Sequence, residues 1–153
     1  MKLWPFISTV VAIVISAVAM SSSAVGSSGA RVVPGFLSPS GNIRCHYDAK
    51  AFAPRGTKRL LTCGLRHADY AMQLQRRCLA GDWHGFGLSG KGKPTIFCAG
   101  NPNFSIRPVY TTLAYGNSWT RGPFTCTSRI DGVTCRNQSG HGVFISRQSY
   151  HTW

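Results

Sequence analysis

The sequence predicts a small, mainly β domain: an antiparallel sandwich or barrel that is stapled by disulfides and holds at most one short helix. From position 36 onward, short runs rich in Val, Ile, Thr, Phe and Tyr alternate with turn residues about every ten residues. The chain of 153 residues also has six cysteines, all beyond an apolar N-terminal segment. Short strands combined with an even set of cysteines are typical of small cross-linked β folds.

Residues 1–30 are predicted to be a signal peptide with a tail of small residues, followed by a single domain over residues 31–153. Lys2 precedes an almost entirely apolar run from Leu3 to Met20, and triplets of small residues follow it. A positive start, an apolar core and an Ala-x-Ala-like end are typical of secretion signals that are later removed. The cleavage site stays open, and so does retention as an anchor, because the run approaches the roughly 20 residues that cross a bilayer. We therefore expect a protein that is secreted or attached to the cell envelope.

The predicted strands are separated by clusters of Gly, Pro, Asn, Asp and Ser, which favour turns. We expect strands over residues 43–47, 59–65, 83–88, 95–99, 118–127, 133–137 and 142–147. Residues 68–79 have an imperfect helical spacing of apolar side chains, with Arg76 and Arg77 on the solvent side. This segment is the one candidate for a short helix.

The cysteines are expected to form three disulfides and to hold no metal. They are Cys45, Cys63, Cys78, Cys98, Cys126 and Cys135. Their intervals contain none of the close C-x2-C or C-x4-C pairs that zinc sites use. Zinc ligation would also need free thiolates, which an oxidising compartment disfavours.

One bridge follows from hairpin geometry. A four-residue loop over residues 129–132 sets Cys126 directly opposite Cys135, within disulfide reach, with Gly132 in the left-handed position of the loop. A two-residue loop at Asp131 and Gly132 would spoil that register. For the other four cysteines, pairing Cys45 with Cys63 and Cys78 with Cys98 is the simplest of three arrangements.

The composition is strongly basic, with 17 Lys and Arg residues against four Asp and no Glu, and the formal net charge is +13. Such a surface attracts polyanions at long range, and salt weakens the attraction. We expect a partner among anionic cell-wall polymers, lipid headgroups, extracellular nucleic acid and acidic proteins, or a solvated basic surface without a dedicated partner. The candidate anion-binding residues are Arg55, Lys58, Arg59, Arg76 and Arg77.

Aromatic residues interleaved with Arg could stack on bases or sugars, although a small β domain needs most of them for its core. The set comprises Trp83, Trp119, Trp153, Tyr47, Tyr110, Tyr115 and Tyr150. Tyr115, Trp119 and the C-terminal residues 150–153 are the ones expected at the surface.

A second class of function, a small secreted hydrolase of phosphodiesters resembling a ribonuclease, is kept as the alternative to a non-catalytic binding module. Two imidazoles and a cationic side chain can cleave a phosphodiester without a metal. His84 and His141 are the candidates, because both adjoin glycines at predicted strand ends. No serine lies in a G-x-S-x-G motif, and no cofactor is implied. The binding module is the favoured interpretation.

The motifs at the two ends of the predicted domain are its most specific feature. They read F-L-S-P-S-G-N-I-R-C from Phe36, F-T-C-T-S-R from Phe124, G-V-T-C-R-N from Gly132 and G-H-G-V-F-I-S-R-Q-S-Y from Gly140. On these motifs the chain resembles a family of small secreted actinobacterial proteins of unknown function. The resemblance implies an exported β domain with paired cysteines and implies no activity. His84 and Asn101 stand where relatives often have Gly and Asp.

Overall fold

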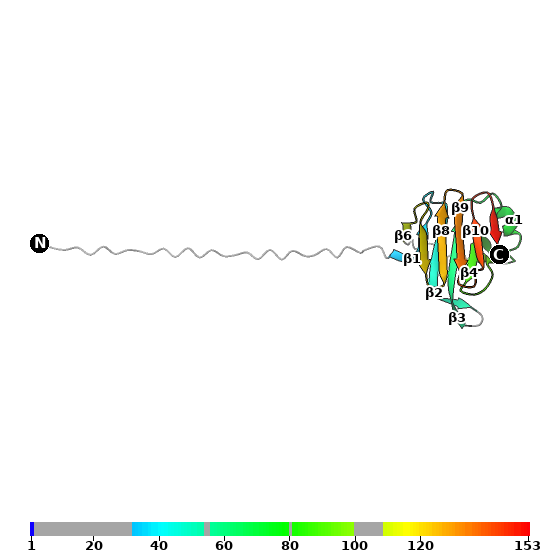
Figure 1. The fold of residues 1–153 in the computed structure, drawn as a ribbon, viewed down its shortest axis with the longest axis horizontal. Helices are drawn as coiled ribbons and strands as arrows, with labels where there is room; N and C mark the ends of the chain where they lie inside the picture. The colour runs from blue at the N-terminus through cyan, green and yellow to red at the C-terminus, as the bar shows by residue number, and fades with distance from the viewer. Residues whose placement is uncertain (2–31, 54–55, 80, 100–108) are drawn as a thin grey trace.

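The structure is a computed structural model, and it describes Met1 and residues 32–53, 56–79, 81–99 and 109–153. Within these residues the chain forms strands β1 to β11 and one short helix, α1 (Figure 1). The strands make two sheets of six and five strands, and neither closes into a barrel. The mainly β class is therefore confirmed as a sandwich. The predicted signal peptide and Asn101 lie outside the described residues.

Sheet A is the larger sheet, with strand order β5-β4-β3-β2-β1-β6. Its strands are β1 (Val32–Leu37), β2 (Ile43–Ala53), β3 (Gly56–Leu65), β4 (Asp82–Ser89), β5 (Thr95–Ala99) and β6 (Val109–Thr112). Neighbouring strands are antiparallel except for β1 and β6, which run parallel. Helix α1 (Ala71–Gln75) packs beside β4 and buries Leu74.

Sheet B is an antiparallel meander with strand order β11-β10-β9-β8-β7. Its strands are β7 (Ser118–Arg121), β8 (Phe124–Arg129), β9 (Gly132–Asn137), β10 (Gly142–Ile145) and β11 (Tyr150–Thr152). Side chains of both sheets form one core cluster. Phe36 of sheet A packs on Trp119 with ring centroids 5.4 Å apart, and Tyr47 meets Phe124 at 6.0 Å. The inner faces of the two sheets therefore lie against each other.

Two disulfides meet in the middle of this core, one from each sheet. Cys45–Cys63 joins β2 to β3 and Cys126–Cys135 joins β8 to β9, in both cases between directly opposed residues. The Sγ atoms of Cys63 and Cys135 lie 3.9 Å apart, and all four cysteines are buried. The third bridge, Cys78–Cys98, ties the chain after α1 to edge strand β5. The predicted Cys126–Cys135 bridge is confirmed, and the other four cysteines have the simplest of the three arrangements that the sequence left open.

The register of the β8–β9 hairpin is confirmed, but its predicted loop is wrong. Arg129 still pairs with Gly132, so the loop has two residues, Ile130 and Asp131, instead of four. Pairing can continue to Gly132 because this residue has a φ of +155° and no side chain. A Cβ at this position would lie 2.5 Å from the carbonyl oxygen of Ile145. The chain can therefore turn tightly beside β10.

Other boundaries differ from the prediction. The predicted strand 118–127 is two strands, because Gly122, with a φ of +55°, and Pro123 turn the chain between them. The helix covers Ala71–Gln75, within the predicted span 68–79, and Arg76 and Arg77 after it are exposed as expected. Strands β1, β6 and β11 were not predicted. They are short or contain Pro and Gly, so the alternating pattern of a strand is weak in them. β6 pairs with the distant β1, whereas β11 pairs with the preceding strand, β10.

No helix within the described residues is long and apolar enough to cross a bilayer.

Candidate functional site

The outer face of sheet A carries a shallow trough of about 280 Å³. Every strand of the sheet contributes to its lining, through Leu37, Arg44, His46, Thr62, Gly64, His84, Phe97 and Tyr110. The trough therefore runs across the strands, from Phe97 on edge strand β5 to Tyr110 on edge strand β6. At a strand spacing of about 4.8 Å, the two edge strands of the six-stranded sheet lie about 24 Å apart.

Glycines keep the trough open, since they place no side chain on the outer face of the central strands. Gly35 lies on β1, between Tyr110 and β2, and a Cβ there would overlap the carbonyl oxygen of Cys45 and lie 3.0 Å from the Tyr110 ring. The ring of Tyr110 can therefore lie across β1 and reach the side chains of β2. On β3, a Cβ at Gly64 would lie 2.6 Å from the carbonyl oxygen of His84.

The trough is lined by cationic and aromatic groups. The Arg44 guanidinium lies 5.7 Å from the centre of the Tyr110 ring, and His46 meets the same ring edge-on at 6.3 Å. Arg66 lines one side, and its backbone N–H donates to the carbonyl oxygen of Asn42 at 2.9 Å. None of the described residues that line the trough is acidic. The arrangement favours an anion with flat, ring-bearing parts.

His46 is a neutral member of this lining. Burial lowers the pKa of His46, the positive charge of Arg44 adds to this effect, and Asp48 opposes it. Its Nδ1 atom is buried and has no hydrogen-bond partner within the described residues. A charged imidazole needs acceptors for both of its N–H groups, so protonation is disfavoured here. The positive charge of the trough therefore comes from the guanidinium groups.

The lowered pKa of His46 makes stability depend on pH. The unfolded chain, in which histidine titrates near 6.5, binds a proton in mild acid more readily than the folded chain does. The contribution of neutral, buried His46 to the free energy of unfolding is therefore fully present above the pKa of histidine in the unfolded chain. It is lost as the pH falls below that pKa. We expect the thermal midpoint of the wild type to fall from about pH 7 to pH 5 more steeply than that of a His46→Gln variant. His67→Gln, at an exposed position, should keep the wild-type slope, and identical slopes for all three proteins would contradict the assignment.

The two histidines predicted as a catalytic pair are divided between the sheets. His84 lines the trough, whereas His141 lies on the turn between β9 and β10. There the Asn137 side chain accepts a hydrogen bond from the backbone N–H of His141 at 3.1 Å. It also donates to the carbonyl oxygen of Ser89, and Ser89 lies at the opposite end of β4 from His84. The structure brings His46, not His141, into the trough with His84.

The predicted anion-binding residues whose side chains the structure describes do not line the trough. Arg59 is exposed on β3, and Arg76 and Arg77 are exposed after α1. Arg55 lies outside the described residues, and Lys58 is described by its backbone alone. The sequence analysis did not select Arg44 and His46 as site residues, although their pattern indicates that they share a face. In the run I-R-C-H-Y they alternate with the buried Cys45 and Tyr47, which places both on the outer face.

Two aromatic residues expected at the surface pack inward instead. Trp119 contacts Phe36, and Tyr150 lies 5.0 Å from both Phe86 and Tyr70 between ring centroids. The C-terminal Trp153 covers Gly142 and donates from its indole N–H to the carbonyl oxygen of Gly140 at 2.9 Å. Tyr115 is exposed as expected.

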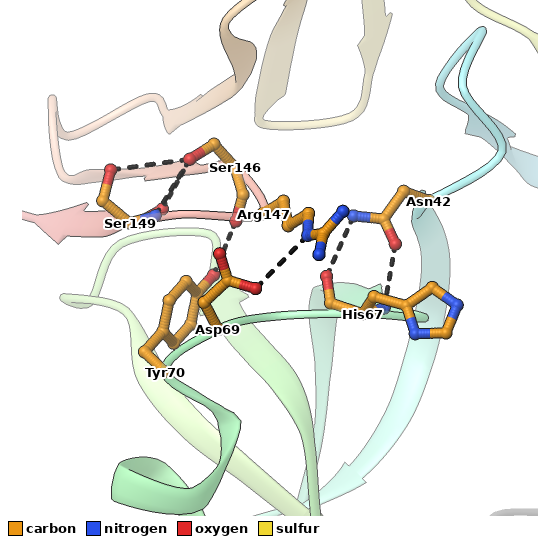
Figure 2. A network of polar contacts seen from close by, with 7 residues as sticks. All are labelled: Asn42, His67, Asp69, Tyr70, Ser146, Arg147 and Ser149. Atoms are coloured by element: carbon orange, nitrogen blue, oxygen red, sulfur yellow. Dashed lines mark hydrogen bonds and ion pairs between the residues drawn. The ribbon is translucent and has the colours of Figure 1, made fainter.

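A polar network at one end of the sandwich joins loops of both sheets (Figure 2). The Asn42 side chain donates to the His67 carbonyl oxygen at 3.0 Å and accepts from the His67 N–H at 2.8 Å. Arg147 pairs with Asp69 at 3.2 Å, and the Tyr70 hydroxyl donates to the Ser146 carbonyl oxygen at 3.0 Å. Burial raises the pKa of Tyr70, which keeps this donor protonated.

The polar network acts structurally rather than as a nucleophile with its base. The Ser146 hydroxyl is bonded to the backbone of Ser149, and His67 is held through its backbone atoms. Because Arg66 is bonded to the same Asn42, the network also positions one side of the trough.

The fold and the site together define a disulfide-stapled, two-sheet β sandwich with a cationic, ring-lined trough across its larger sheet. The chain belongs to a family of unknown function, DUF6636, whose model matches residues 11–152. No curated protein and no solved structure matches it.

Proposed function

We propose that the protein is an exported, non-catalytic module that binds anionic polymers of the envelope or the extracellular medium in the trough of sheet A. The supporting observation is the lining of the trough, where Arg44 and Arg66 stand among neutral polar and aromatic groups without an acidic side chain. Guanidinium groups match phosphate and carboxylate oxygens through paired hydrogen bonds. A trough that spans all six strands suits a linear chain better than an enclosed small molecule.

Export is supported by the apolar N-terminal run and by the three disulfides, which persist in oxidising compartments. The alternative, a phosphodiester hydrolase using His84 and His141, draws no support from the geometry, because His84 lines the trough whereas His141 lies on the turn between β9 and β10.

Binding should depend on the arginines of the trough rather than on net charge alone. We expect an Arg44→Gln, Arg66→Gln variant to bind inorganic polyphosphate about tenfold more weakly and to reduce the slope of log affinity against log salt by about two. The matched control, Arg121→Gln, Arg129→Gln, removes the same charge from exposed positions on sheet B. Fluorescence anisotropy with end-labelled polyphosphate over a salt series measures both quantities.

A third variant, Arg76→Gln, Arg77→Gln, tests the cations beside α1 that the sequence singled out. Equal losses in all three variants would point to a general charge effect and count against the trough. A larger loss in the third variant would move the site to α1.

A further inference from the structure

We infer that the polymer held in the trough is a single-stranded nucleic acid, lying across the strands of sheet A with bases against Tyr110 and Phe97. This inference rests on the proposed function and names the class of polymer. It follows from the order of groups along the trough, from the flat surface at its β6 end and from the neutral donors on its floor.

The two rings lie on opposite edge strands, and the guanidinium group of Arg44 lies between those strands. Tyr110 lies on edge strand β6 and Phe97 on the opposite edge strand, β5. Arg44 on β2 and His84 on β4 lie between them. Domains that bind single strands combine a cationic groove for the backbone with aromatic faces on which successive bases stack. Polyphosphate and polyol phosphates carry charge but no rings, so they would leave both aromatic side chains unused.

The β6 end of the trough is a built stacking surface. The Arg44 guanidinium lies over the Tyr110 ring at 5.7 Å, and Gly35 beneath them has no side chain that would lift the ring from the sheet. Nucleic-acid bases stack on aromatic rings and also on guanidinium planes. An incoming base could therefore stack on the guanidinium that already lies over the tyrosine ring.

The floor of the trough carries neutral polar groups of the kind that meet base edges and sugar hydroxyls. His46 is neutral because burial lowers its pKa, and Thr62 is its directly opposed residue on β3. A duplex hides its base faces inside the helix, so it could use the arginines but not the rings. The trough therefore favours a single strand over a duplex of the same length and charge.

The decisive experiment compares ring variants on probes with and without bases. Labelled oligothymidylates, a duplex of matched length, inorganic polyphosphate and heparin are titrated against the full domain in low salt. We expect Tyr110→Leu and Phe97→Leu each to weaken oligothymidylate binding about tenfold while leaving polyphosphate binding unchanged. Tyr110→Phe, which keeps the ring, and Tyr115→Leu, which removes an exposed ring elsewhere, should bind as the wild type does. Circular dichroism checks that each variant is folded.

Length gives a second measurement that needs no variant. A trough between edge strands about 24 Å apart should hold at most roughly four nucleotides, so affinity should rise steeply up to about that length and then level off.

The outcomes separate the inference from the proposed function. Equal affinity for oligothymidylate and polyphosphate, without loss in the ring variants, would overturn the inference and leave the anion-binding trough in place. Ring-dependent binding of heparin in preference to oligothymidylate would also overturn it, in favour of an acidic glycan. If no polyanion is bound in low salt, the proposed function itself fails.

Discussion

Replacing Cys126 and Cys135 with alanine should lower the free energy of unfolding by about 4 kcal/mol. About 2.7 kcal/mol of this is the loop-closure entropy that a cross-link over so short a loop removes from the unfolded chain. The remainder is packing. Both sulfur atoms are buried, and the Sγ of Cys135 touches that of Cys63 at 3.9 Å, so their removal leaves a void in the middle of the sandwich.

The matched control is the partly exposed bridge, removed in a Cys78→Ala, Cys98→Ala variant. It closes the longer loop, with a sequence separation of 20 against 9, so chain entropy alone ranks it as the more stabilising bridge, at about 3.3 kcal/mol. Because the Cys126–Cys135 bridge also packs the core, we expect its removal to lower the free energy of unfolding more than removal of the Cys78–Cys98 bridge does. Equilibrium unfolding in guanidinium without reductant gives both values. A larger loss for the Cys78–Cys98 variant would contradict the role assigned to the paired core bridges.

Gly85→Ala should be the most damaging single substitution on the outer face of sheet A, with a loss of about 3 kcal/mol or more. Gly85 has a φ of +139°, in a region that residues with a side chain rarely occupy. A Cβ there would overlap the carbonyl oxygen of Cys63 and lie 2.7 Å from the Cα of Gly64. Both obstacles are backbone atoms of the central strand β3, which cannot move aside without disturbing the sheet.

Gly87→Ala, two residues further along β4, is the control. There a Cβ would meet the Thr95 hydroxyl at 3.5 Å and a Leu60 methyl at 3.7 Å, which are ordinary contacts. We expect a change within about 0.5 kcal/mol. Denaturant unfolding of both variants measures the difference, and equal losses would show that Gly85 is not constrained by its backbone position.

Much of the fold could be predicted because its cues are local. The Cys126–Cys135 bridge followed from the pleat of one hairpin, in which opposed residues of neighbouring strands come within disulfide reach. β4, β5 and β9 were predicted nearly to their ends, since each is a short apolar run bounded by turn residues. β1 and β6 could not be found in this way. They pair with each other in parallel across more than seventy residues, and no local pattern encodes such a contact.

The candidate site was harder to predict, because it collects residues from all six strands of sheet A. The pattern around Cys45 indicates that Arg44 and His46 share a face, but not that Tyr110 lies two strands away on the same face. His84 was found by its glycine neighbours. Its proposed partner His141 was not brought to it, because flanking glycines reveal a turn and say nothing of which sheet the turn belongs to.

The sequence by itself determined the β class, the Cys126–Cys135 bridge and the strongly cationic character of this protein. All three depend on composition or on contacts within one or two hairpins. Only the tertiary structure decided that the two core bridges meet between the sheets and that a particular set of basic and aromatic side chains lines one trough. The physical reason is that the pairing of distant strands, set by burial over the whole core, places each strand beside its neighbours. That placement decides which outward-facing side chains become a site.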